Sequence, residues 1–81
     1  HLAWGTAEAA AGAEPLRLLA PDAIIRIDTG RCRIAVDGTR VRITAIAGRT
    51  TIASAVFPER DITLDTGQTG EVDGPRVAPM P

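Results

Sequence analysis

The chain has 81 residues and a formal net charge of −1, so it forms one small domain that buries only about 60% of its unfolded surface and is marginally stable alone. Its single cysteine excludes an internal disulfide framework, and one cysteine with one histidine excludes the four-ligand structural zinc sites. Trp4 and Phe57 are the only aromatic residues, which is few for a module that stacks nucleic-acid bases.

The N-terminal segment, residues 1–15, is rich in alanine and ends at Pro15. Thr6 suits the N-cap of a short helix, but isolated helices of this length are marginal in water. We therefore predict a weak helix or a loose arm that docks through Trp4, on this chain or on a neighbour. Because the chain begins at His1 rather than Met, we expect a processed product or a fragment of a longer protein.

Two short strands are predicted next, over residues 16–19 and 24–28, separated by an Ala-Pro-Asp break. Thr29-Gly30 is expected to turn the chain into the central hairpin. Apolar residues then alternate with polar ones on both sides of Asp37-Gly38, between residues 31 and 46. This pattern predicts a β-hairpin, since Asp-Gly between two alternating segments is a strong hairpin signal.

In the register of a two-residue Asp-Gly turn, Arg33 lies opposite Arg42, with Arg31 and Arg40 beside them. Like charges directly across an antiparallel pair repel. Two explanations remain open: the chain's own carboxylates neutralise these arginines, or an anionic partner does.

After Ile43 the alternation slips, which indicates a bulge or a strand covered on both faces. Gly48-Arg49 is expected to be the next turn, and residues 50–57 the most buried strand, which Pro58 ends. Two further strands are predicted over residues 61–66 and 69–72, followed by a proline-rich tail from residue 73.

Short strands at this spacing predict an all-β fold, a small antiparallel sandwich, barrel or β-roll. We expect an arm over residues 1–15, a β-domain over 16–73 and a tail over 74–81. No strict sequence repeat is visible, and no apolar segment is long enough for a membrane helix.

Charge is unevenly distributed along the chain. Residues 23–57 contain six arginines and two aspartates, a net +4, whereas residues 58–74 contain one arginine and five carboxylates, a net −4. Opposite blocks of this size favour self-complementarity, either within one chain or head to tail between chains.

Residues that carry out chemistry are few. His1 stands at the terminus without a second histidine, Ser54 lies in an apolar strand, and Cys32 falls on the inward face of the hairpin. The acidic stretch from Asp61 to Asp73 fits neither an EF-hand nor a calcium repeat. We expect no catalytic, cofactor or metal site, and no enzyme.

Three elements in residues 37–68 resemble the periplasmic domain of FecR-type regulators: the turn and strand 37–43, the small-residue turn 47–49, and Ile-Thr-Leu-Asp-Thr-Gly-Gln at 62–68. The same span is similar to small bacterial cupin-like β-domains that have a comparable Gly-Gln turn. Either resemblance implies a non-enzymatic regulatory or binding domain of a bacterial envelope protein.

The function that we expect is a structural module that associates with copies of itself, as a filament or oligomer subunit, through strand edges, the arm and the charge blocks. An extracellular or periplasmic location suits this role. The alternatives are the envelope domain above and a polyanion-binding module. The candidate interaction residues are Trp4, Arg31, Arg33, Arg40, Arg42, Asp61 and Asp65.

Overall fold

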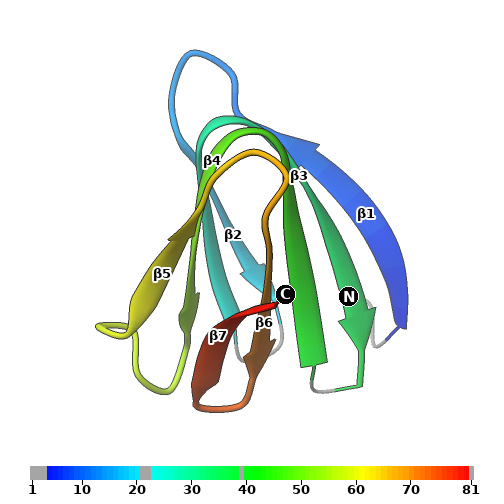
Figure 1. Cartoon of the computed structure of the whole chain (residues 1–81), viewed down its shortest axis with the longest axis vertical. Helices are drawn as coiled ribbons and strands as arrows, with labels where there is room; N and C mark the ends of the chain where they lie inside the picture. Colours follow the sequence, from blue (N-terminus) through cyan, green and yellow to red (C-terminus); the bar gives the residue numbers. More distant parts are fainter. Residues whose placement is uncertain (1–3, 21–22, 39, 81) are drawn as a thin grey trace.

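The computed structural model describes residues 4–20, 23–38 and 40–80, which form seven antiparallel strands and no helix (Figure 1). The predicted all-β class is confirmed. The strands are β1 (Trp4–Ala10), β2 (Leu16–Ala20), β3 (Ala23–Asp37), β4 (Arg40–Ser54), β5 (Asp61–Leu64), β6 (Thr69–Asp73) and β7 (Arg76–Met80).

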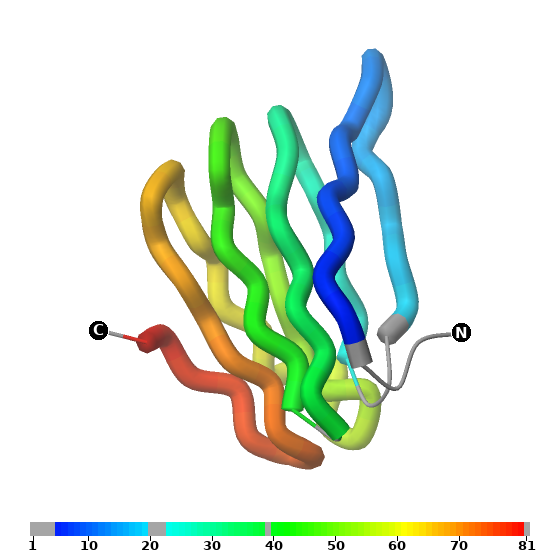
Figure 2. The backbone as a smooth tube through the Cα atoms, turned by 90° about the vertical axis from the view of Figure 1, so that its right-hand side faces the viewer, coloured from blue at the N-terminus to red at the C-terminus, as the bar shows by residue number. Residues whose placement is uncertain are grey.

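The single sheet is folded over on itself into two layers. β3 and β4 are 15 residues long each and pass through both layers, as the arches at the top of Figure 2 show. The front layer runs β1-β3-β4-β6-β7, and the back layer consists of β2, β5 and the other halves of β3 and β4. Apolar side chains from both layers therefore meet between them.

Two facing glycines make the fold-over possible. Gly30 of β3 pairs with Gly48 of β4, and both have a positive φ, 78° and 79°. A Cβ on Gly30 would collide with the carbonyl oxygen of Ala47, and one on Gly48 with that of Thr29. The turns predicted at Thr29-Gly30 and Gly48-Arg49 are wrong, because both strands continue through these positions with a bend.

A bulge accompanies each glycine. Asp28 of β3 and Ile46 of β4 have no partner in the register of the β3–β4 pair, so the slip of alternation after Ile43 does mark a bulge. Each bulge lies two residues before its glycine, and the β4 positions follow the β3 positions by 18 residues. The two halves of the hairpin are therefore related by an approximate two-fold axis between Gly30 and Gly48.

The core lies between the layers and is centred on β4. Its largest fully buried apolar side chains are Ile25, Ile27, Val41, Ile43, Ile52, Leu64 and Val72. All of residues 50–54 are buried, which confirms the prediction of the most buried strand, although β4 ends at Ser54 and leaves Val56 and Phe57 exposed.

The predicted helix or loose arm is wrong for the described residues. β1 pairs with β3 over seven residues from Trp4 to Ala10, and Ala9 and Ala11 pack against the core. Strand pairing overrides the intrinsic helix preference of alanine here. The tail is also ordered as β7, which pairs with β6 and tolerates Pro79 because it is an edge strand.

The turn of the central hairpin lies one residue later than predicted. Asp37 pairs with Arg40, so Val36 lies opposite Val41 and Ile34 opposite Ile43. This register puts opposite charges next to the turn and matched apolar side chains on the inner face.

Candidate functional site

The four arginines of the central hairpin are exposed on the outer face of the front layer. The predicted opposition of Arg33 and Arg42 is wrong, since Arg33 lies opposite Thr44 and Arg42 opposite Ala35. The one-residue shift of the turn thus separates the like charges. Arg31 and Arg40 occupy the same face, opposite Ala47 and Asp37.

Carboxylates of the acidic segment face two of these arginines across the β4–β6 pair. Arg40 Nε lies 3.6 Å from Asp73 Oδ2, and Arg42 Nε lies 3.4 Å from Glu71 Oε2. The basic and acidic blocks therefore pair within one chain. Because all four side chains are partly exposed, each pair contributes at most about 1 kcal/mol to stability.

The other two arginines, Arg31 and Arg33, form no ion pair with any residue in the described part of the chain. Glu8 of β1 lies opposite Arg33 in the strand register, and Ala10 opposite Arg31. The outer face is therefore a mixture of both charges rather than a uniformly basic surface.

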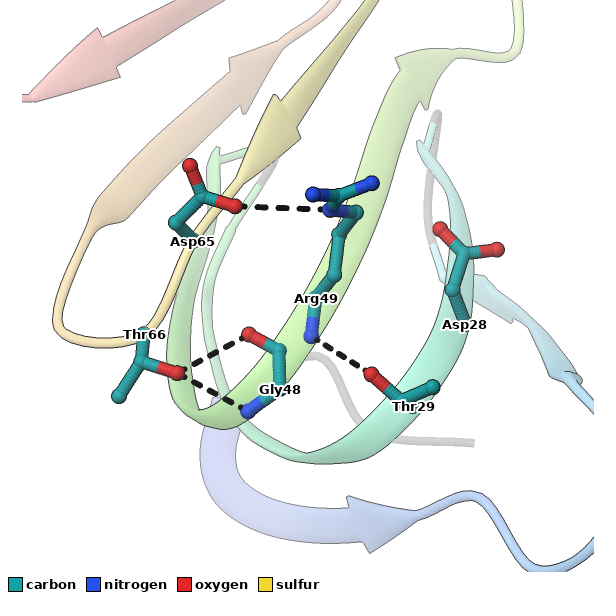
Figure 3. A pocket seen from close by; sticks show the side chains of 6 residues that line it. All are labelled: Asp28, Thr29, Gly48, Arg49, Asp65 and Thr66. Carbon is teal, nitrogen blue, oxygen red and sulfur yellow. Dashed lines mark hydrogen bonds and ion pairs between the residues drawn. The ribbon is translucent and has the colours of Figure 1, made fainter.

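An open hollow of about 550 Å³ lies beside the bend (Figure 3). The Gly48 N–H donates to Thr66 Oγ1 at 3.0 Å, Thr66 Oγ1 donates to the Gly48 carbonyl at 3.1 Å, and the Arg49 N–H donates to Thr29 Oγ1 at 3.2 Å. Arg49 Nε also lies 3.5 Å from Asp65 Oδ1. These polar groups bind one another, so they fasten the β5–β6 loop to the bend.

A smaller groove of about 200 Å³ lies on the outer face of the back layer. Its lining includes Ile24, Ala53 and Pro58 beside Arg17, Arg26 and Asp61. Arg17 lies directly opposite Arg26 in the β2–β3 register. The like-charge pair expected in the central hairpin thus occurs here, where Arg26 Nε is held 2.8 Å from Asp28 Oδ1.

Cys32 and Thr50 meet in the core, one from each layer. Burial raises the pKa of the Cys32 thiol, and a side-chain hydrogen bond with Thr50 opposes that rise. This contact is a weak one, because the buried Thr50 hydroxyl has no hydrogen-bond partner of good geometry. The cysteine is a core side chain, as its place on the inward face predicts.

Ser54 is buried and binds backbone groups only. Its Oγ donates to the Gly74 carbonyl at 2.7 Å and accepts from the Val56 N–H at 3.1 Å. His1 lies outside the described residues. Within the described ranges, no three His, Cys, Asp or Glu side chains gather as a metal site would require.

The two flanks of the β3–β4 pair differ. On the flank formed by β5, β6 and β7, hereafter the closed flank, Gly70 and Val72 of β6 are buried. On the flank formed by β1 and β2, hereafter the open flank, Gly5 and Ala7 of β1 are exposed. Trp4 begins this strand, opposite Asp37.

The inward apolar side chains of the β3–β4 pair also become less buried toward the open flank. Val41 and Ile43 of β4 are fully buried, whereas their partners Val36 and Ile34 of β3, one strand nearer to the open flank, are only half-buried. Apolar surface is therefore left incompletely covered on the side of β1 and β2.

Sequence reasoning predicted neither the difference between the two flanks nor the approximate two-fold symmetry that relates β3 to β4. The signal was Gly-Arg-x-x-Ile, which occurs at residues 30–34 and again at 48–52. It is too short to stand out as a repeat, yet it marks the equivalent positions of the two bends.

Within the part of the chain that the structure describes, no helix has the length and hydropathy needed to cross a membrane. Comparison with known proteins found no matching family model, no matching curated protein and no matching solved structure.

Proposed function

We propose that this chain is a non-enzymatic structural module that associates with copies of itself through the open flank. The observation that supports this most directly is the length and composition of the free edge there. β1 has seven residues and β2 has five, and each is hydrogen-bonded to β3 on one side only among the described residues.

Native proteins protect exposed strand edges with charges, prolines or short strands. The strands of the open flank contain no proline and no lysine, and their only charged residues are Glu8 and Arg17. On the closed flank, β5 has only four residues and β7 contains Pro79. The open flank is therefore the edge better suited to accept a strand from another chain.

Association would also complete the core. The half-buried side chains of Ile34, Val36, Leu16 and Leu18 lie toward the open flank, and covering them removes apolar surface from water. Burial contributes about 25 cal/mol per Å² of apolar area, which matters for a domain as small as this one.

The test is the particle mass, measured by size-exclusion chromatography with light scattering over a concentration series. Wild-type protein is expected to exceed 8.5 kDa as concentration rises. Ala7→Lys, which places a charge on the open flank, is expected to lower the mass, while the loop variant Ala55→Lys serves as the matched exposed control. A mass of 8.5 kDa at every concentration would overturn the proposal.

A second candidate function is binding of an anionic partner. Arg31 and Arg33 support it, because they are exposed and form no ion pair within the described residues. Binding of heparin as a polyanionic probe should then weaken steeply with salt and should fall in the double variant Arg31→Ala/Arg33→Ala. Binding that does not change between low and high salt would rule it out.

A further inference from the structure

The approximate two-fold axis makes β2 and β6 equivalent. β2 pairs with the N-terminal half of β3, and β6 pairs with the N-terminal half of β4 in the same way. Under this relation Leu18 of β2 corresponds to Gly70 of β6. The two strands nevertheless differ at their second edge.

β6 is bonded on its second edge by β7, whereas no strand among the described residues bonds the second edge of β2. Leu19 of β2, on the outer face of the sheet, is 77% exposed, more than the apolar side chains of Val56 at 54% and Phe57 at 37%. On the closed flank the second edge of β6 is therefore paired within the chain. On the open flank, the corresponding edge of β2 can accept a strand from a partner.

We propose that β2 of a second copy fills this place, antiparallel to β2, with Leu18 of each copy opposite the other. This inference rests on the proposed self-association and specifies its strand and register. An antiparallel pairing of identical strands is isologous, so it produces a closed two-fold dimer.

Charge selects the register. Side chains keep their faces only when odd positions oppose odd ones and even positions oppose even ones. A pairing centred on Arg17 would put the arginines of both copies opposite each other, beside Arg26 on either side. Four adjacent guanidinium groups on one face are strongly unfavourable.

A pairing centred on Leu18 avoids that row and uses all five residues of β2. It sets Arg17 opposite the partner's Leu19, so that the aliphatic part of the arginine covers the exposed leucine. A pairing centred on Leu19 would engage only the last three residues of the strand, 18–20. The Leu18 register therefore gives the longest pairing without like charges.

A charge exchange across the Arg17–Leu19 contact tests this register. In the dimer, Leu19→Arg places the new arginine of each copy opposite Arg17 of the other copy. These two like-charge pairs are expected to weaken dimerisation about tenfold or more. Adding Arg17→Glu to it sets a glutamate opposite each new arginine and is expected to restore the wild-type dissociation constant. Val56→Arg, which changes another exposed apolar residue, is the matched control and should have no effect.

Dissociation constants come from sedimentation equilibrium, and circular dichroism with thermal unfolding confirms that each variant is folded. If wild-type protein is oligomeric but Leu19→Arg has no effect, or Arg17→Glu fails to rescue it, this pairing is wrong and the proposed self-association stands. If wild-type protein is monomeric at every concentration, both are wrong.

Discussion

The closed and open flanks are built on equivalent halves of one hairpin, yet only the closed flank brings its two layers into full contact. On the closed flank, Gly70 is packed so tightly that a Cβ would lie 2.6 Å from Ile52 Cδ1 and 3.2 Å from Leu64 Cδ2. On the open flank, Ala7 of β1 is exposed, and the described residues of β1 and β2 make no extensive contact with each other. The core of this small domain is therefore packed more completely on the closed flank than on the open flank.

The difference follows from what each flank adds to the shared hairpin. The closed flank has β7, which contacts β5 of the other layer, and a serine that joins β4 to the β6–β7 turn. On the open flank, β1 contains Gly5, Ala7, Ala9 and Ala10, and a five-residue loop over residues 11–15 joins β1 to β2.

The bend supports both flanks, so its loss should have the largest effect. In Gly30→Ala or Gly48→Ala, the new Cβ would collide with a backbone carbonyl group of the facing strand, and the residue would also have a positive φ. The two backbones cannot move apart without opening the sheet. We expect each to lower the free energy of unfolding by about 3 kcal/mol or more, measured by urea denaturation. Gly12→Ala, which has nothing within 4 Å of its Cβ, should change it by under about 0.5 kcal/mol.

The flanks themselves should respond differently to added volume. Gly70→Val adds three carbon atoms, a Cβ and two methyl groups, against Ile52 and Leu64 and is expected to cost about 1–3 kcal/mol. Ala7→Val adds two methyl groups, but no new Cβ, in an exposed strand position and should be neutral or slightly stabilising. Equal shifts of the two urea midpoints would show that the open flank is packed as tightly as the closed one.

Ser54 is expected to hold the closed flank together. Ser54→Ala leaves the partly buried Gly74 carbonyl without its 2.7 Å hydrogen bond and the Val56 N–H without its acceptor. We expect a loss of about 1–3 kcal/mol, with faster hydrogen exchange across β6 and β7. Thr6→Ala on exposed β1 is the control from the open flank, and a loss as large as that of Ser54→Ala there would contradict this assignment.

How far sequence alone predicted the molecule depends on the range of the interactions involved. Alternation located most strands, because side-chain period is a local property. Glycine was misread at Gly30 and Gly48, because a positive φ serves a tight turn and a bend within a continuous strand equally well. Residues 4–10 were misread as a helix or arm because their structure depends on pairing with β3, which no local pattern reveals.

The candidate interaction residues show the same limit. A one-residue error in the turn moved Arg33 from opposite Arg42 to opposite Thr44, and the like-charge pair appeared at Arg17 and Arg26 instead. Charge layout did predict that the basic and acidic blocks could pair within the chain, because blocks of opposite sign attract in any register. The open flank was not predictable, since it depends on which strands have neighbours.

The Cys32 thiol should have the smallest effect, which is a dependence of the free energy of unfolding on pH. Cys32 stands at the centre between the flanks, and burial raises the pKa of its thiol above the ordinary value of 9.0. Above about pH 9 the unfolded chain loses the thiol proton while the folded chain keeps it, so the free energy of unfolding should fall as pH rises, by at most about 1.4 kcal/mol per pH unit. The chain contains no lysine and no tyrosine, so among its side chains only this thiol changes charge between about pH 8 and 11.

Urea denaturation under reducing conditions at pH 8, 9 and 10 should show this slope in the wild type. Cys32→Ala should show a flat profile at lower overall stability, and a slope that persists in this variant would assign it to another group.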